Sequence, residues 1–181
     1  MKKLDEPLPG LIVIEAPVYA DLRGHFFEHF EKRKFAALGI EADFVQDNVS
    51  RSRRGTIRGL HFQCPHPQGK LIGVSQGSIF DVAVDLRRSS PSFGRWAAVE
   101  LAEGDGRSFW IPAGFAHGFQ ALSDNVTVHY KVTDYWHVDA ECTIRWDDPQ
   151  IGVAWPIADP ILSSKDAAAP LLEKLSSHLP E

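Results

Sequence analysis

The segment Gly55–Gln63 combines a strand pattern with two side chains that could do chemistry. Ile57 and Phe62 favour a half-buried strand. Arg58 and His61 lie between them, although both are costly to bury without partners. Histidine titrates near neutral pH and so suits proton transfer, while an arginine fork matches anionic oxygens. We therefore expect His61 to be a general base and Arg58 to hold an anionic substrate. The alternative is a core histidine with hydrogen-bond partners and a surface arginine.

The spacing of these two residues raises a geometric question. Strict alternation places Arg58 and His61 on opposite faces of a strand, because they are three positions apart. Either a bulge or bend at Gly59 re-aims the strand, or the arginine reaches the site of a neighbouring subunit.

A second histidine lies in Pro112-x-Gly114-x-x-His117, which resembles the second motif of the cupin jelly rolls. Metal-binding cupins carry a His-x-His pair on an earlier strand, where a period of two points both imidazoles inward. Here that strand offers His61-x-Gln63, and an amide is a poor ligand for a transition metal. His66 lacks the required spacing. We expect no metal, and a pocket in which His61 and His117 act as acids, bases or anion ligands.

One further candidate is Tyr130, which shares the face of Val128 and Val132 in an alternating segment. Its hydroxyl needs a partner if it is buried, so it is either a core tyrosine or a proton donor. Cys64 and Cys142 form no CxxC pair, which argues against a disulfide framework and a thiolate zinc site.

The composition is that of an ordinary globular protein. The chain has 181 residues, 44% hydrophobic and 24% charged, which suits a single domain spanning residues 1–181. A net charge of −5 argues against a nucleic-acid partner. No apolar run is long enough to span a membrane, and the N-terminus lacks the apolar region of a signal peptide. We therefore expect a cytoplasmic protein with no membrane partner.

The elements that must position these residues are mostly short strands. Turn residues separate segments with strand patterns at 11–19, 26–30, 44–50, 55–63, 70–76, 78–86, 96–101, 109–111, 118–122 and 126–133. Helices are expected at 31–38 and, as a C-terminal tail interrupted by Pro170 near its start, at 167–178. In 78–86, Asp81 and Asp85 share one face and the opposite face is apolar. Many short strands between turns predict an all-β, cupin-like jelly roll.

A series of short motifs points to one enzyme family. In chain order they are Asp21-x-Arg23-Gly24-x-Phe26-x-Glu28, Gln46-Asp47-Asn48-x-Ser50, Arg58-Gly59-Leu60-His61-Phe62-Gln63, Gln68-Gly69-Lys70, Phe80–Arg87, Ser90-Pro91-x-Phe93-Gly94-x-Trp96, Ile111–Phe119, Tyr130-Lys131-x-Thr133, Asp148–Gly152, Trp155-Pro156 and Leu162–Asp166. Together and in this order, they resemble the dTDP-4-dehydrorhamnose 3,5-epimerase family over nearly the full length. The family often has Tyr-Tyr where this chain has Tyr135-Trp136, which alters packing near the sugar.

The resemblance implies a homodimeric jelly roll that uses neither metal nor organic cofactor and acts on dTDP-4-dehydro-6-deoxy-D-glucose. It implies that His61 is the base, Tyr130 the acid, Asp166 the carboxylate paired with His61, and Lys70 the cation near the keto oxygen. The positions that it implies for substrate binding are Arg23, Phe26, Glu28, Gln46, Asp47, Asn48, Arg58, His117, Glu141 and Lys165.

The implied chemistry agrees with the residue types. A 4-keto group acidifies the hydrogens on C3 and C5, so one ketone serves two epimerisations, and each inversion needs a base and an acid on opposite faces of the ring. Three alternatives stay open: an epimerase that acts only at C3 or only at C5, a metal-dependent cupin enzyme, and a non-catalytic module that binds sugar nucleotides.

Overall fold

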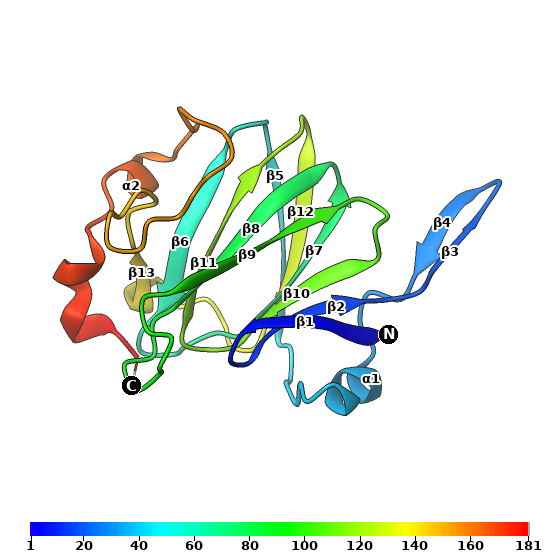
Figure 1. Cartoon of the computed structure of the whole chain (residues 1–181), viewed down its shortest axis with the longest axis horizontal. Coiled ribbons are helices and arrows are strands. Elements are labelled where there is room, and N and C mark those ends of the chain that lie inside the picture. The colour runs from blue at the N-terminus through cyan, green and yellow to red at the C-terminus, as the bar shows by residue number, and fades with distance from the viewer. Residues whose placement is uncertain (181) are drawn as a thin grey trace.

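Residues 1–180 are described by a computed structural model, in which antiparallel strands form two sheets that pack face to face (Figure 1). The six-stranded sheet has the spatial order β1 (Lys2–Leu8), β2 (Leu11–Glu15), β10 (Arg107–Ile111), β7 (Lys70–Gln76), β12 (Val126–Val132) and β5 (Gln46–Ser52). The five-stranded sheet has the order β13 (Glu141–Thr143), β6 (Ile57–Gln63), β11 (Phe115–Ala121), β8 (Ser78–Asp85) and β9 (Trp96–Ala102). The predicted all-β jelly roll is confirmed.

The main core lies between the two sheets. Ile72 and Phe109 project into it from the six-stranded sheet, and Ile79 and Phe119 from the five-stranded sheet. A second cluster covers the outer face of the five-stranded sheet, where Val82 and Leu86 pack under C-terminal residues such as Leu172. β8 is therefore buried on both faces, which its alternating pattern did not predict, and Asp81 and Asp85 are fully buried.

Each of the two short helices is capped by the side chain of the residue that precedes it. α1 (Lys32–Ala37) follows Glu31, whose carboxylate accepts a hydrogen bond from the Lys34 amide, close to the predicted bounds. α2 (Ser164–Ala167) follows Ser163, which caps the Asp166 amide. The interruption predicted near Pro170 in the helical tail at 167–178 is confirmed, but the part after it is a 3₁₀ turn and not an α-helix. The chain leaves α2 before Pro170 and then forms a 3₁₀ turn at Leu172–His178, because a proline in a helix interior removes a hydrogen bond.

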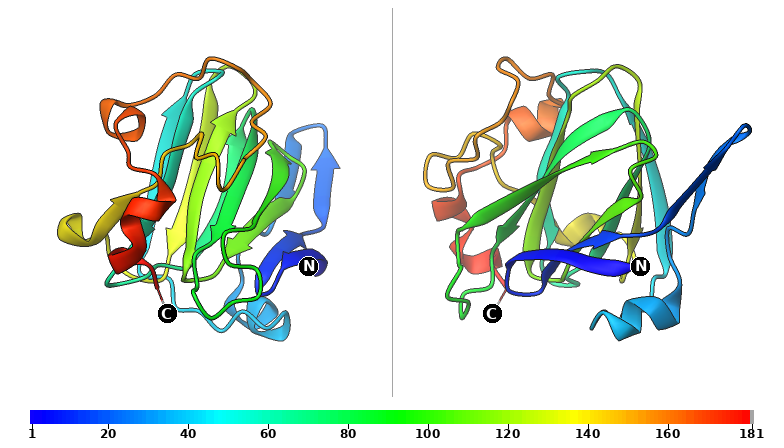
Figure 2. Two further views of the ribbon diagram at one scale, coloured as in Figure 1. Left: turned by 60° about the vertical axis from the view of Figure 1, so that its left-hand side comes forward. Right: turned by 45° about the vertical axis from the view of Figure 1, so that its right-hand side comes forward.

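A two-stranded hairpin projects from the body of the molecule (Figures 1 and 2). It pairs β3 (Val18–Asp21) with β4 (Gly24–Phe27). The single strand predicted at 11–19 is thus divided after Glu15, where the chain passes through Pro17 and leaves the large sheet. The tip is exposed, and Tyr19, Leu22 and Phe26 are exposed apolar side chains on it.

Two strands were not predicted. β1 is mostly polar and exposed at the edge of its sheet, and β13 is only three residues long, so neither has a hydrophobic pattern. A short 3₁₀ turn, η1 (Val138–Ala140), precedes β13. Within residues 1–180, no helix is long and apolar enough to cross a membrane.

Candidate active site

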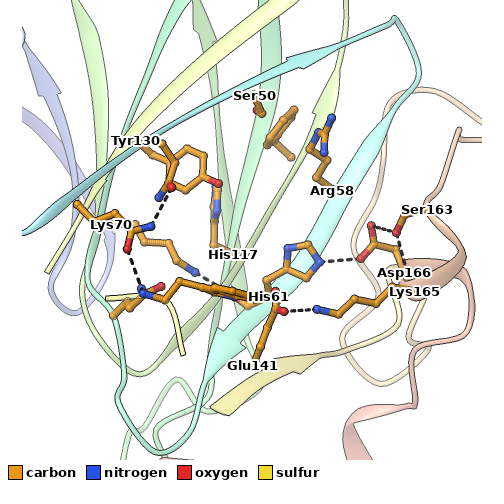
Figure 3. Close-up of a pocket in the computed structure, with 15 residues that line it drawn as sticks. Ser50, Arg58, His61, Lys70, His117, Tyr130, Glu141, Ser163, Lys165 and Asp166 are labelled. Carbon is orange, nitrogen blue, oxygen red and sulfur yellow. Dashed lines mark hydrogen bonds and ion pairs between the residues drawn. The ribbon is translucent and has the colours of Figure 1, made fainter. Parts of the chain in front are cut away.

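A cavity of about 320 Å³ is lined by strands of both sheets and by the segment around α2 (Figure 3). The side chains that line it are those of Gln46, Asn48, Ser50, Arg58, His61, Gln68, Lys70, His117, Phe119, Tyr130, Trp136, Glu141, Ser163, Lys165 and Asp166. All four of the predicted catalytic residues are in this set, as are six of the ten predicted binding residues.

His61 projects from β6 and is held by a carboxylate from a distant part of the chain. Its Nε2 lies 2.6 Å from Oδ1 of Asp166, which is 3% exposed, and Oδ2 of Asp166 accepts a hydrogen bond of 2.8 Å from the Ser163 hydroxyl. Burial raises the pKa of Asp166, but its bonds with His61 and Ser163 outweigh that effect and leave it below its ordinary value. Asp166 is thus an anion that orients the imidazole.

Tyr130 enters the cavity from β12, which belongs to the opposite sheet from β6. It lies opposite Asn48 of β5 and packs against the main core. Burial raises the pKa of the Tyr130 phenol above its ordinary value, so the hydroxyl keeps its proton at neutral pH. His61 and Tyr130 can therefore take and give a proton on two sides of a molecule placed between the sheets.

Lys70 is the buried cation of the cavity. It is 7% exposed, and its Nζ donates a hydrogen bond of 3.2 Å to the main-chain carbonyl of His61. Burial lowers the pKa of Lys70 to about 8, against the opposing influence of Glu141 and Asp81. At neutral pH most molecules still carry the charge, so Lys70 can stabilise an oxyanion.

His117 lies beside His61, since the two residues pair across β6 and β11. Its Nε2 is 2.7 Å from Oδ1 of the fully buried Asp81, and burial raises the pKa of that carboxyl. Asp81 therefore fixes the second imidazole as Asp166 fixes the first. The acidic face predicted on β8 supplies this support from behind the cavity.

Arg58 and His61 both line the cavity, although strict alternation separates them. The register of β6 against β11 shifts between His117 and Phe119, next to Gly59, whose φ is 134°. A Cβ at this position would lie 2.5 Å from the Cα of Gly118, so only glycine fits. The bend predicted at Gly59 as one of two possibilities is confirmed, and it turns Arg58 toward the same cavity.

The remaining polar residues form the walls and rim. Gln46 donates a hydrogen bond of 2.9 Å to Asn48 and accepts one of 3.1 Å from the Trp136 amide. Nζ of Lys165 lies 2.6 Å from Oε2 of Glu141. These groups can bind sugar hydroxyls and phosphate oxygens.

Four predicted binding residues do not line this cavity. Arg23 and Phe26 lie on the exposed β3–β4 hairpin, where Arg23 pairs with Asp21. Glu28 follows the hairpin and pairs with Lys34. Asp47 points to the other face of β5, as alternation requires between Gln46 and Asn48, and pairs with Lys131.

Comparisons with known proteins identify the family. The family profile described as dTDP-4-dehydrorhamnose 3,5-epimerase matches residues 5–174. A protein of that name from Methanothermobacter thermautotrophicus is 52% identical over 162 residues, which is 88% of each chain. The crystal structure of an epimerase from Legionella pneumophila in complex with dTDP-4-keto-L-rhamnose is 46% identical, with a TM-score of 0.95, over 99% of this chain and 97% of that one. A 3'-monoepimerase from Streptomyces bikiniensis in complex with dTDP-quinovose is 32% identical, with a TM-score of 0.90, over 97% of this chain and 91% of that one.

The chain belongs to the dTDP-4-dehydrorhamnose 3,5-epimerase family. The family resemblance and the isomerase class predicted from the sequence are confirmed.

The cavity of this family member does not fit the ion of metal-binding cupins. Gln63, at the second position of the cupin motif, is 5% exposed and bonds to the main chain of His66, Tyr135 and His137, none of which lines the cavity. Glu141 is paired with Lys165, and Asp81 and Asp166 are each bonded to a histidine. Within residues 1–180, His61 and His117 belong to no group of three close ligands.

Five residues that line the cavity of this epimerase family member were not predicted as site residues. Ser50, Gln68, Phe119 and Ser163 lie in the family motifs but their residue types indicate no particular chemistry. Trp136 marks a departure from the family pattern, which was the only available signal. All five are in contact with the cavity because of the fold.

Proposed function

We propose that this chain inverts C3 and C5 of dTDP-4-dehydro-6-deoxy-D-glucose and so forms dTDP-4-dehydro-L-rhamnose for dTDP-L-rhamnose biosynthesis. The observation that carries the proposal is the placement of His61 and Tyr130, which enter one cavity from opposite sheets. Inversion of a carbon needs a base on one face of the sugar and a proton donor on the other. The relatives' names supply the substrate class.

The reaction requires only proton transfers. His61, oriented by Asp166, removes the hydrogen at C3 or C5, and the electron pair moves into the C4 ketone to give an enolate. Tyr130 then donates a proton to the opposite face, and proton exchange with water restores both groups for the second carbon. Apart from the shift of the C4 carbonyl π bond, only bonds to hydrogen are broken and formed, and no electron is transferred to an external acceptor.

The enolate oxygen needs a positive partner, and Lys70 is the residue that we assign to it. Its ammonium is buried in the cavity wall, where a charge interacts more strongly than in water. The chain thereby stabilises the intermediate that both epimerisations share, so one cation serves two inversions.

The nucleotide end of the substrate would be bound by the outer part of the cavity. Arg58, which also bonds to Ser52 and to the Arg51 carbonyl, offers a guanidinium for the diphosphate. His117 and Lys165 are further polar contacts, and Gln46 and Asn48 suit hydroxyl groups. Neither a metal ion nor an organic cofactor is required.

We also propose that the protein is a homodimer. The β3–β4 hairpin exposes Tyr19, Leu22 and Phe26, and such apolar side chains on a projecting element are typical of an interface. In a symmetric dimer, Arg23, Phe26 and Glu28 could reach the partner's cavity, which would give these predicted binding residues a substrate to contact. We propose a cytoplasmic location, and neither nucleic acid nor membrane as a partner.

Proton NMR of the keto-sugar nucleotide in D₂O tests the activity. With the wild-type enzyme we expect deuterium at both C3 and C5, together with the inverted product. In the His61→Asn variant, the rates of deuterium incorporation and of product formation should both fall by roughly 10²–10⁴-fold. The variant should still bind dTDP, because the imidazole acts on protons and not on the nucleotide. Normal turnover by this variant would contradict the mechanism.

The second candidate is an epimerase of another deoxysugar that inverts C3 alone. It is favoured by the similarity to the Streptomyces 3'-monoepimerase, which has the same fold. The same NMR experiment separates the two, because stable deuterium at one carbon only would support the single inversion.

A further inference from the structure

Beside the catalytic cavity, two loops bring two histidines and an aspartate together. His66 follows β6, and Asp134 and His137 follow β12. Nδ1 of His66 lies 3.8 Å from Oδ2 of Asp134, and Nε2 of His137 lies 3.7 Å from Oδ1 of Asp134. The two imidazole rings are stacked, with centroids 4.2 Å apart.

The buried side-chain amide of Gln63 links the main chains of the two loops. Nε2 of Gln63 donates hydrogen bonds to the main-chain carbonyls of His66, at 2.8 Å, and of Tyr135, at 3.2 Å. Its Oε1 accepts a hydrogen bond of 2.8 Å from the His137 amide. The residue that replaces the second histidine of the cupin motif therefore fixes the backbone of both histidines of this second cluster, so the cluster is pre-organised.

We propose that His66, Asp134 and His137 form a binding site for a divalent transition metal, with Zn²⁺ as the best match. Two imidazoles and one carboxylate are a common ligand set for zinc, whose fourth position is taken by water. The three ligand atoms lie within 4.8 Å of one another. Ligands of a tetrahedral zinc ion are roughly 3.3 Å apart, so side-chain rotations that bring them together by at most about 1.5 Å complete the site.

The surroundings leave room for an ion and its water. His66 and His137 line a cavity of about 450 Å³ together with Pro65, Trp136, Val138, Asp139 and Ala140. The site is accessible to solvent, since His66 is exposed and Asp134 and His137 are only partly buried. Imidazole nitrogen favours Zn²⁺ over Mg²⁺ and Ca²⁺, which prefer oxygen ligands.

The site is connected to the rim of the catalytic cavity. Trp136 lines both cavities, and its amide donates to Gln46, which lines the catalytic one. An ion bound by His137 and by His66 would cross-link the loop that carries Trp136 to the loop after β6. The bound ion would therefore make the rim more ordered. It would take no part in the proton transfers at His61.

Calorimetric titration of the metal-free protein, carrying no affinity tag, with Zn²⁺ tests the site. We expect one equivalent to bind, and at least a tenfold loss of affinity in His66→Asn and His137→Asn. Asparagine is the suitable replacement for His66, whose φ is 68°, because asparagine tolerates this conformation. Mg²⁺ should give no saturable binding at the same concentrations.

Two matched controls separate the site from general surface attraction. His25→Asn removes an exposed histidine from the distant hairpin, and Asp139→Asn removes a neighbouring carboxylate from the same loop. Both should bind Zn²⁺ as the wild type does. A second readout is amide hydrogen exchange over residues 134–140, which Zn²⁺ should slow in the wild type but not in His137→Asn. Absence of binding, or equal binding by the two histidine variants and the wild type, would overturn the proposal.

Discussion

Asp166 lies 2.6 Å from Nε2 of His61, although 105 positions of the chain separate them. The contact is made because α2 packs beside β6 and because Ser163 both caps that helix and binds Oδ2 of Asp166. The contact with Asp166 occupies Nε2 of His61, so Nδ1 is the nitrogen available to take a proton in the proposed reaction.

Replacing Asp166 by asparagine should lower kcat by roughly 10²-fold or more and change KM little. The amide has the same size, but its NH₂ group can donate to Nε2 and so favour the wrong tautomer of His61. Steady-state kinetics with the keto-sugar nucleotide checks this expectation. Asp147→Asn, which removes a surface carboxylate paired with Arg145, is the control and should be neutral. A kcat within twofold of the wild type would show that Asp166 does not orient the base.

Replacing Tyr130 by phenylalanine should separate deprotonation from inversion. The His61 side of the cavity is unchanged, so the base can still remove a proton and return deuterium to the same face. We expect exchange with D₂O to continue with retention of configuration, while formation of inverted product falls by about 10²-fold or more. NMR measures both rates in one sample. Tyr135→Phe, at an exposed position on the rim loop, should behave like the wild type. Unchanged inversion would assign the proton donor elsewhere.

Lys70→Met should make the protein more stable and less active. Burial lowers the pKa of Lys70 from 10.5 to about 8, so protonation of Lys70 is less favourable in the native state than in the unfolded chain. This costs on the order of 3 kcal/mol of stability below pH 8, and the cost disappears as the pH rises toward 10.5. Methionine keeps the length and apolar stem without the charge. Urea unfolding should show that the variant has a higher free energy of unfolding than the wild type at pH 7, and that this difference is smaller at pH 10. Its kcat should fall, because the enolate loses its cation. A loss of stability at pH 7 would contradict the argument.

Hydrophobic pattern predicted the strands well wherever one face of the strand is buried. β7 and β12 match the expected segments closely, because Gly, Pro and polar turns bound them. The pattern failed for β1, which is a polar edge strand, and for the strand predicted at 11–19, which divides near Pro17 into parts of two different sheets. Pairing of distant segments decides such cases, and a local pattern does not contain it.

The site was predictable to the extent that its chemistry depends on residue type. The role predicted for His61 follows from its side chain and its neighbours, whereas the pairing with Asp166 was available only through the family motifs. The bend at Gly59 could be anticipated because Arg58 and His61 conflict with strict alternation. The position of the β3–β4 hairpin could not be anticipated, because no pattern around Arg23 or Phe26 indicates that these residues project away from their own chain's cavity.

Asp85 provides a test of the fold that is independent of catalysis. This fully buried carboxylate accepts hydrogen bonds from Arg87, Ser90 and Ser92, which outweigh the effect of burial and lower its pKa to about 2. Because the unfolded value is near 3.8, the ionised form stabilises the native state above pH 4 by about 2 kcal/mol, and this contribution is lost as the pH falls toward 2. Asp85→Asn should therefore be less stable than the wild type at pH 7. The difference in the free energy of unfolding between the two proteins should be smaller at pH 4 and smaller again at pH 3. Urea unfolding at these pH values measures it, with the exposed Asp124→Asn as the control. A difference that stays constant with pH would mean that the charge of Asp85 contributes nothing to stability.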